Sequence, residues 1–377
     1  MDSHRILILY ITEKSGHHHA AMALEKTLHL IDKTLEVYTI DAFDYTNPIL
    51  NKIVHNTYMH VIKRRPEVWE YLYDNPDVVK RSQNLKKIIH KYNSRKLINL
   101  LSELNPDIIV STQAFPCGMV ADLKKHGKIN IPIVGVTTDY TAHSFWYYDN
   151  VDLYVVPDES TKSKMVQNGI RDERVKVYGI PIAPEFAYPV DRDGVFRRLL
   201  LDQDIPVVLV MGGGKGLGNI KQLVYSLCRV KDYFQLLVVC GVNTKLFHYL
   251  DAKSRYLNRF KPIRVLEYVS NISELMSIAT ILISKPGGIT TAEALAKELP
   301  MIIFNPLPGQ ERSNTDFLIR NGAAIRCDRL TDIGIIISEL LGEGNKLKIM
   351  ANSAKNMGHP DSSFRISGEV LSLVGYA

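Results

Sequence analysis

The chain has 377 residues, of which 46% are apolar and 23% charged, a balance typical of a soluble globular protein and not of a disordered one. Because this length exceeds what one hydrophobic core usually serves, we expect two domains of about 150–200 residues each. The net charge is only +6, and no apolar run approaches the roughly 20 residues of a membrane-spanning helix, which argues against a transmembrane protein.

Cysteine usage and the first apolar run narrow the class of protein further. The first run, 6–11, is short and is followed by Glu13 and Lys14, so we expect a strand and not a signal peptide or an anchor. The cysteines are far apart, without a spacing typical of metal ligands, and are expected to be reduced thiols in the core of a cytoplasmic protein. They are Cys117, Cys228, Cys240 and Cys327.

Short aliphatic or β-branched runs alternate with longer amphipathic stretches, the order that gives parallel sheets with helices on both faces. The expected strands are 6–11, 36–40, 108–111, 133–137, 153–156 and 175–178 in a first series, then 207–211, 234–240, 263–267, 281–284, 301–304 and 324–326. The segment GIPIAPEFAYPVDRDG (179–194) separates the series with its prolines and glycines. We therefore predict two doubly wound α/β domains, 1–185 and 195–377, facing a cleft, with the last helix able to pack back on the first domain.

The stretch TEKSGHHHAAMAL (12–24) follows the first strand and opens a helix. Three consecutive histidines suggest a metal site, but adjacent helical residues point in different directions and cannot share one ion. A histidine here can also be a helix cap, a surface residue, or a general base that needs no large pKa shift.

Between residues 50 and 100, basic side chains greatly outnumber acidic ones and alternate with aromatic side chains. Lys63, Arg64 and Arg65 precede Trp69 in this segment. The mixture is typical of interfacial helices on anionic lipid. A solvated basic face or a nucleic-acid patch would have the same composition.

Glycine-rich turns follow two expected strands of the second half. In VVLVMGGGKGLG (207–218) the glycines allow close backbone approach and a helix follows, which suits a phosphate, although GxxxxGK[ST] is absent and a plain tight turn is the alternative. In SKPGGITTAEAL (284–295) a Pro-Gly-Gly turn precedes a helix that Thr290 or Thr291 can cap. Glu293 can accept both hydroxyls of a ribose, or merely stabilise the helix dipole.

A third turn, NPLPGQERSN (305–314), carries Gln310, Glu311 and Asn314. Such side chains are suited to hydrogen-bonding the hydroxyls of a sugar, and a plain polar loop is the alternative. Together with LEYVSNISELM (266–276), these stretches resemble, in order, the donor-binding half of a GT-B glycosyltransferase. The resemblance is greatest to processive diacylglycerol glucosyltransferases and monogalactosyldiacylglycerol synthases, extends from about residue 5 to 325, and is weaker to the peptidoglycan N-acetylglucosaminyltransferase.

The resemblance implies a place for each part of a UDP-sugar. Tyr268 and Val269 align with residues that contact the uracil, and Glu293 aligns with the residue that binds the ribose. Gln310 and Glu311 align with the pair that takes the hexose. The family's diphosphate contacts align with Gly213, Gly214, Lys215, Pro286, Gly287, Gly288 and Thr290.

The resemblance also implies an acceptor and base region in the first half. His17 is the matching histidine of the family's Gly-His-x-x-Ala-Ala pattern, where it would act as base or orient the acceptor, although this loop has one glycine where the pattern has two. In VTTDYTAHSFWYYDNVD (136–152), the residues that match a second family signature are Thr138, Asp139, His143 and Trp146. Asp139 would orient the base or itself be the base, and Trp146 would pack against lipid or sugar. Without the resemblance this is an aromatic loop packed on its own domain.

These observations predict an inverting glycosyltransferase that moves glucose or galactose from a UDP-sugar to diacylglycerol or a glycolipid. We expect no metal and no cofactor in the site, a helix N-terminus and Lys215 stabilising the diphosphate charge, no nucleic-acid partner, and a peripheral place on the cytoplasmic face of an anionic membrane. The alternatives are a UDP-sugar sensor without turnover and an enzyme related to UDP-N-acetylglucosamine 2-epimerase.

Overall fold

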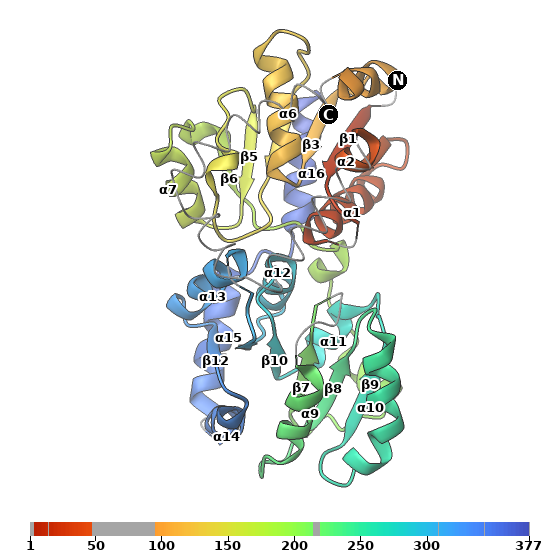
Figure 1. Cartoon of the computed structure of the whole chain (residues 1–377), viewed down its shortest axis with the longest axis vertical. Helices are drawn as coiled ribbons and strands as arrows, with labels where there is room; N and C mark the ends of the chain where they lie inside the picture. Colours follow the sequence, from red (N-terminus) through yellow and green to blue (C-terminus); the bar gives the residue numbers. More distant parts are fainter. Residues whose placement is uncertain are drawn as a thin grey trace. The chain divides into compact units, whose positions relative to one another are not determined.

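The structure is a computed structural model that describes residues 4–13, 15–46, 95–213, 219–307, 309–342 and 344–376 (Figure 1). The chain forms two compact units. The N-terminal unit comprises Met1–Pro184, Leu307–Gln310 and Asp361–Ala377, and the C-terminal unit comprises Glu185–Pro306 and Glu311–Pro360. The basic segment with Lys63, Arg64, Arg65 and Trp69 lies outside the described residues.

A six-stranded parallel sheet forms the core of the N-terminal unit, in the order β2-β1-β3-β4-β5-β6. The strands are β1 (Arg5–Tyr10), β2 (Glu36–Asp41), β3 (Ile108–Ser111), β4 (Ile133–Val136), β5 (Leu153–Val156) and β6 (Val175–Val177). The order reverses between β1 and β3, because β2 is added on one side of β1 and the later strands on the other. In doubly wound sheets a ligand crevice opens at such a reversal, beyond the carboxyl ends of the strands.

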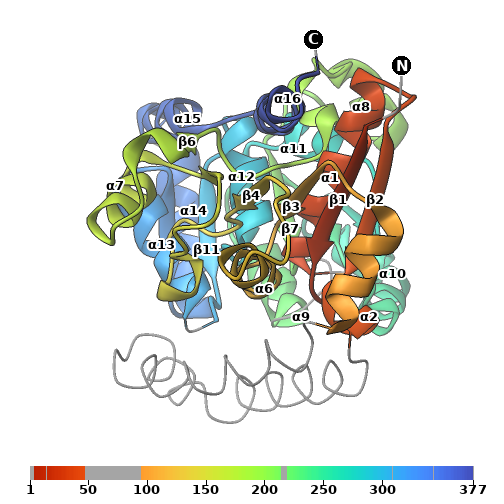
Figure 2. The same ribbon diagram turned by 90° about the horizontal axis from the view of Figure 1, so that it is seen from above.

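Helices cover both faces of this sheet. Leu7 and Leu9 face the core layer that contains α6 (Ala114–Lys125), whereas Ile6 and Ile8 face the opposite layer. That second layer is built by α1 (Gly16–Ile31) and α16 (Ser362–Leu373). Figure 2 shows α6 and α16 on opposite sides of β3 and β4. Burial on both faces explains why the central strands β1, β3, β4 and β5 are mostly apolar and do not alternate, whereas the edge strands β2 and β6 carry polar residues and are partly exposed.

The last helix, α16, belongs to the N-terminal unit although it ends the chain. The hydroxyls of Ser362 and Ser363, at its first turn, donate to the carbonyl oxygens of Ile180 and Ile182 at 2.8 and 2.5 Å. Beyond its end, the hydroxyl of Tyr376 donates to the carboxylate of Asp32 at 2.7 Å. Both ends of α16 are therefore fastened to this unit by hydrogen bonds.

The C-terminal unit has a second six-stranded parallel sheet, in the order β12-β11-β10-β7-β8-β9. Its strands are β7 (Val207–Met211), β8 (Gln235–Val239), β9 (Ile263–Leu266), β10 (Ile281–Ser284), β11 (Met301–Phe304) and β12 (Ala324–Cys327). Its helices are α8 (Arg192–Leu199), α9 (Ile220–Cys228), α10 (Thr244–Leu257), α11 (Ile272–Ile278), α12 (Gly288–Ala296), α13 (Gln310–Arg320), α14 (Ile333–Gly342) and α15 (Gly344–Met357). Here the order reverses between β7 and β10, which places the crevice at their carboxyl ends.

All twelve strands that the sequence predicts are present, each within one residue at either end. The expectation of buried cysteines outside disulfides is confirmed for all four. Among the described residues, no helix is both long enough and apolar enough to span a bilayer.

Candidate functional site

His17 lies at the carboxyl edge of the N-terminal sheet, where the strand order reverses. It is the second residue of α1, which begins shortly after β1. Its ring nitrogen Nδ1 lies 3.0 Å from the carbonyl oxygen of Thr112 and 2.7 Å from the hydroxyl oxygen of Thr138. Thr112 comes directly after β3, and Thr138 comes two residues after β4. One imidazole is therefore held by groups beyond the ends of two neighbouring strands.

The loop before His17 is fixed by local hydrogen bonds. Ser15 caps α1, since its hydroxyl oxygen accepts from the backbone N–H of His18 at 3.2 Å. The backbone N–H of Thr12 donates to the carboxylate of Asp41, the last residue of β2, at 2.8 Å. Thr12 adopts a left-handed conformation with φ of 68°, which glycine tolerates best. The loop thus turns sharply at Thr12, in a conformation that usually needs glycine. The loop also has one glycine fewer than the family pattern.

Burial controls the protonation of His17. The side chain is only partly exposed, and burial lowers its pKa to about 4, against the opposing effect of the hydrogen bond to the Thr112 carbonyl. The expectation of a base without a large pKa shift is therefore wrong. At physiological pH the imidazole is neutral and can accept a proton, but it is a weaker base than a solvated histidine.

The neighbouring histidines do not complete a metal site with His17. The ring of His18 packs against the ring of Tyr10 in a tilted arrangement, with 4.7 Å between the ring centroids. Within the described ranges, no three His, Cys, Asp or Glu side chains are grouped so that they could hold a metal ion. A metal role for the three histidines has no support in this part of the structure.

The loop after β4 carries Asp139, which follows Thr138 directly, and then His143. Asp139 and His143 are both partly buried. The Nδ1 atom of His143 accepts from the backbone N–H of Phe145 at 3.3 Å and so caps the short 3-10 helix Ser144–Trp146. Nothing in this geometry assigns catalysis to His143, so its catalytic role stays a prediction, as does that of Asp139.

Trp146 departs from what the sequence predicted. Its side chain is 3% exposed and belongs to the hydrophobic core of the N-terminal unit, together with Cys117 and Ala142. A ring so enclosed cannot pack against a lipid or a sugar. The prediction of an acceptor contact is therefore wrong, and the alternative, an aromatic loop packed on its own domain, is correct for Trp146.

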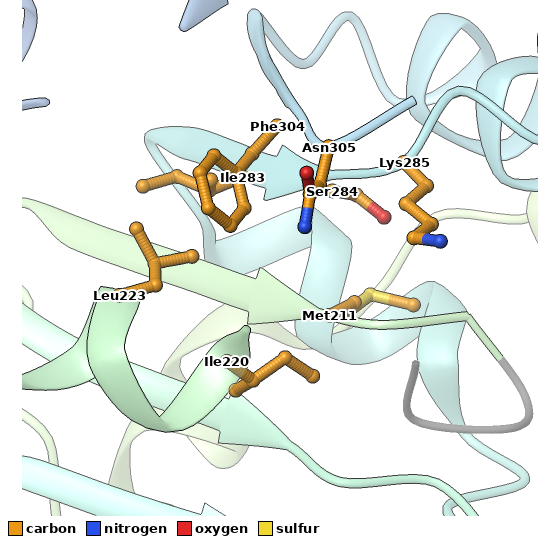
Figure 3. A pocket seen from close by; sticks show the side chains of 8 residues that line it. All are labelled: Met211, Ile220, Leu223, Ile283, Ser284, Lys285, Phe304 and Asn305. Carbon is orange, nitrogen blue, oxygen red and sulfur yellow. The ribbon is translucent and has the colours of Figure 1, made fainter. Parts of the chain in front are cut away.

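A second group of candidate residues gathers at the carboxyl edge of the C-terminal sheet. A small pocket lies beyond the ends of β7, β10 and β11, at the reversal of strand order (Figure 3). Lys285 and Ser284 line it, and the Ser284 hydroxyl is buried without a hydrogen-bond partner among the described residues. Burial lowers the pKa of Lys285, while the charge of Glu311 opposes this shift. The remaining lining residues are Met211, Ile220, Leu223, Ile283, Phe304 and Asn305.

The glycine-rich stretch is described only at Gly212 and Gly213, which directly follow β7 at the same edge. Gly213 follows β7 with φ of +68°, a left-handed conformation that allows the sharp turn. Gly214 and Lys215 lie outside the described residues, so their contact with a diphosphate stays a prediction.

The Pro-Gly-Gly turn leads directly into α12. Gly287 is the N-cap, and the helix begins at Gly288, so Thr290 and Thr291 lie inside the helix and the prediction that one of them caps it is wrong. Asn314, in α13, donates from its side-chain amide to the carbonyl oxygen of Pro286 at 2.9 Å. Its side chain is fully buried, so the expectation that Asn314 contacts a sugar is also wrong. Asn314 instead holds the turn in place.

Replacing Asn314 should loosen this turn. Asn314→Ala leaves the buried carbonyl of Pro286 without its partner, which costs about 1–3 kcal/mol of the free energy of unfolding. The matched control is Asn321→Ala, because the Asn321 amide makes the same kind of bond, to the Phe317 carbonyl at 2.8 Å, in an exposed place. Denaturant unfolding of both variants checks this, and an equal loss in the two would contradict the structural importance of the Asn314 bond.

Glu293 lies in the second turn of α12 and is partly buried. Burial raises the pKa of its carboxyl group to about 8. A glutamate enclosed to this degree, on the helix that follows the Pro-Gly-Gly turn, is costly for the protein to hold ionised. This arrangement is typical of a carboxyl group that serves a ligand, and a first-turn residue acting on the helix dipole is excluded by its position.

The other donor candidates lie on the segment between β9 and α11 and at the start of α13. Tyr268, between β9 and α11, is 55% exposed, and Val269 beside it is partly buried. Gln310 and Glu311 are the first two residues of α13 and are partly buried. Sequence reasoning did not single out Lys285, Thr112 or a structural role for Asn314. The sequence marks Thr112 and Lys285 only by their position directly after a predicted strand.

Comparison with known proteins agrees with this geometry. Residues 17–182 match the family described as Monogalactosyldiacylglycerol (MGDG) synthase, and residues 207–361 match the Glycosyltransferase family 28 C-terminal domain. The chain is 33% identical to the processive diacylglycerol beta-glucosyltransferase of Bacillus licheniformis over 370 residues, which is 97% of this chain and 94% of that protein.

Solved structures share the fold at low sequence identity. S. aureus MnaA, solved with UDP, has a TM-score of 0.64 at 15% identity and covers 99% of this chain and 98% of its own. The Neisseria meningitidis UDP-GlcNAc 2-epimerase bound to UDP-GlcNAc has a TM-score of 0.61 at 15% identity, with 98% and 100% covered. Acinetobacter baumannii MurG has a TM-score of 0.58 at 16% identity, with 98% and 99% covered. The expected GT-B fold is thus confirmed, and the chain belongs to the family of the processive diacylglycerol beta-glucosyltransferases.

Proposed function

We propose that this protein is a glycosyltransferase that moves a hexose from a UDP-sugar to diacylglycerol. The observation that carries this is the likeness to a processive diacylglycerol beta-glucosyltransferase over nearly the whole of both chains. Likeness in fold alone would not decide the activity, because a solved epimerase structure is as similar in fold as a solved glycosyltransferase structure.

The donor is assigned to the carboxyl edge of the C-terminal sheet. The reversal of strand order there, the glycine turn at Gly213 and the free N-terminus of α12 suit a diphosphate, since backbone N–H groups and the helix dipole favour negative charge. Glu293 accepts the ribose hydroxyls. Tyr268 and Val269 contact the uracil, and Gln310 and Glu311 contact the hexose.

The reaction needs one proton removed from the acceptor hydroxyl as the hydroxyl oxygen attacks the anomeric carbon and UDP leaves. His17 takes this proton, because its imidazole is neutral at physiological pH and lies at the strand-order reversal of the N-terminal sheet. Preorganised N–H groups of the glycine turn and of α12, together with the positive charge of Lys215, stabilise the charge that develops on the diphosphate. Attack from the side opposite UDP inverts the anomeric centre.

The direct test is incubation of the purified chain with detergent-dispersed diacylglycerol and, separately, UDP-glucose, UDP-galactose and UDP-N-acetylglucosamine, with EDTA present. Mass spectrometry of the lipids should find a hexosyl-diacylglycerol from one donor, which also identifies the hexose. Binding of UDP without any lipid product would favour a sugar-nucleotide sensor. Conversion of UDP-N-acetylglucosamine to UDP-N-acetylmannosamine would favour the epimerase.

We further propose that the protein works at the surface of an anionic membrane, on the cytoplasmic face. The support is the basic and aromatic composition between residues 50 and 100, where each Lys or Arg near such a surface contributes about 1 kcal/mol. Flotation with anionic vesicles at low salt should recover the protein, and neutral vesicles should not. Failure to float with either would contradict surface attachment and leave the transferase assignment intact.

A further inference from the structure

Thr138 contacts His17, and the family resemblance assigns no role to this contact. Two oxygen atoms, the Thr112 carbonyl at 3.0 Å and the Thr138 hydroxyl at 2.7 Å, both face the same ring nitrogen, Nδ1. A carbonyl oxygen has no proton and can only accept, so its contact is favourable only when Nδ1 carries the hydrogen. If Nδ1 carried no hydrogen, its lone pair would face the lone pairs of the Thr112 carbonyl oxygen.

The consequence concerns the other ring nitrogen. In the neutral imidazole only one nitrogen carries hydrogen, so a proton on Nδ1 leaves Nε2 as the acceptor. With Nδ1–H shared between the two oxygens, the Thr138 hydroxyl acts as a second acceptor. We propose that Thr138 is a positioning residue that, with the Thr112 carbonyl, fixes the His17 tautomer with bare Nε2 and stabilises the imidazolium formed when Nε2 takes the acceptor proton. This inference rests on the proposed function of His17 as base.

The surroundings make such support necessary. His17 is partly buried, and a buried imidazolium is stabilised only by the groups that touch it. Thr112 is fully buried and Thr138 is 5% exposed, so water competes little with their oxygens for the Nδ1 hydrogen. A second bond fixes the geometry, since the Thr112 hydroxyl donates to the backbone carbonyl of His17 at 2.9 Å. The ring and its acceptors are thus held together from both sides.

The tautomer can be read without substrate. In nitrogen-15-labelled protein, the ring signals of His17 are identified by their disappearance in His17→Gln. We expect a protonated Nδ1 and an unprotonated Nε2 at pH 7. The reverse pattern, with hydrogen on Nε2, would overturn the proposal whether or not the protein transfers a sugar, so this readout is separate from any failure of the proposed function.

The matched variants are Thr138→Val, which removes the hydroxyl with little change of shape, and Thr138→Ser, which restores it. Thr138→Val should lower kcat about tenfold, as expected for the loss of one hydrogen bond, with the KM for the UDP-sugar unchanged, and Thr138→Ser should recover most of the rate. Thr137→Val is the control, because the Thr137 hydroxyl is equally buried but donates to the Val155 carbonyl at 3.2 Å. A similar loss in Thr137→Val, or no recovery with serine, would reduce Thr138 to a packing residue.

Discussion

His17→Ala should lower kcat by about 10²- to 10⁴-fold, the range that general base catalysis usually contributes. UDP affinity should remain nearly unchanged, because His17 lies in the N-terminal unit and the donor candidates lie around α12 and α13. The pH profile offers a second check. Since burial lowers the pKa of His17 to about 4, its loss of function by protonation should begin only as the pH falls towards 4, and not near 6.5.

His18→Gln is the matched control for this variant. His18 is the next residue of α1, but its ring packs against Tyr10, away from the threonines that hold His17. In steady-state kinetics with UDP-glucose and diacylglycerol, the kcat of His17→Ala should therefore be at least tenfold lower than that of His18→Gln. Equal kcat values for His17→Ala and the wild-type protein would transfer the role of base to Asp139, whose carboxylate is the other candidate in the sequence.

The fold could be predicted from the sequence because its information is local. The central strands of both sheets are short, mostly aliphatic or β-branched runs that are buried along nearly their whole length, as Ile6 to Leu9 are in β1. Such runs are visible without knowing their partners, and the alternation with amphipathic stretches implies parallel pairing. The order of strands within each sheet, which sets where the crevices lie, needed the structure.

The site could be predicted only in part, because its decisive contacts join distant residues. Thr112 is 95 residues and Thr138 is 121 residues from His17 along the chain, and no local pattern links them. The burial of Trp146 likewise depends on α6 and its loop, so a signature that matched a family position gave no indication that the ring is enclosed. The low pKa of His17 follows from the same long-range packing.

For Glu293, we expect the affinity for a UDP-sugar to rise with pH and to level off near pH 8. Burial raises the pKa of this carboxyl group to about 8, so most of the free protein at pH 7 carries it neutral. Ribose hydroxyls donate more strongly to a carboxylate than to a neutral carboxyl, so binding should release a proton and the association constant should rise up to about tenfold per pH unit below 8. UDP-glucose is the probe, because its diphosphate does not titrate in this range.

Glu293→Gln should abolish this slope and, above pH 8, weaken binding by about 10- to 100-fold, as expected when charge-assisted hydrogen bonds of about 1.5–3 kcal/mol are weakened.

The effect of Glu293→Gln on the free energy of unfolding should have the opposite sign to its effect on binding. A carboxyl group with a raised pKa stabilises the folded state at low pH and loses that stabilisation as the pH rises from 4.5 through 8, so the glutamine variant should gain stability relative to wild type above pH 8. Glu298→Gln is the control, since that exposed carboxylate pairs with Lys355 at 2.9 Å. Calorimetric titration at several pH values would contradict the ribose assignment if wild type and Glu293→Gln bound UDP-glucose with the same affinity throughout, because a carboxyl group that touches the ribose cannot be removed without a change in its binding.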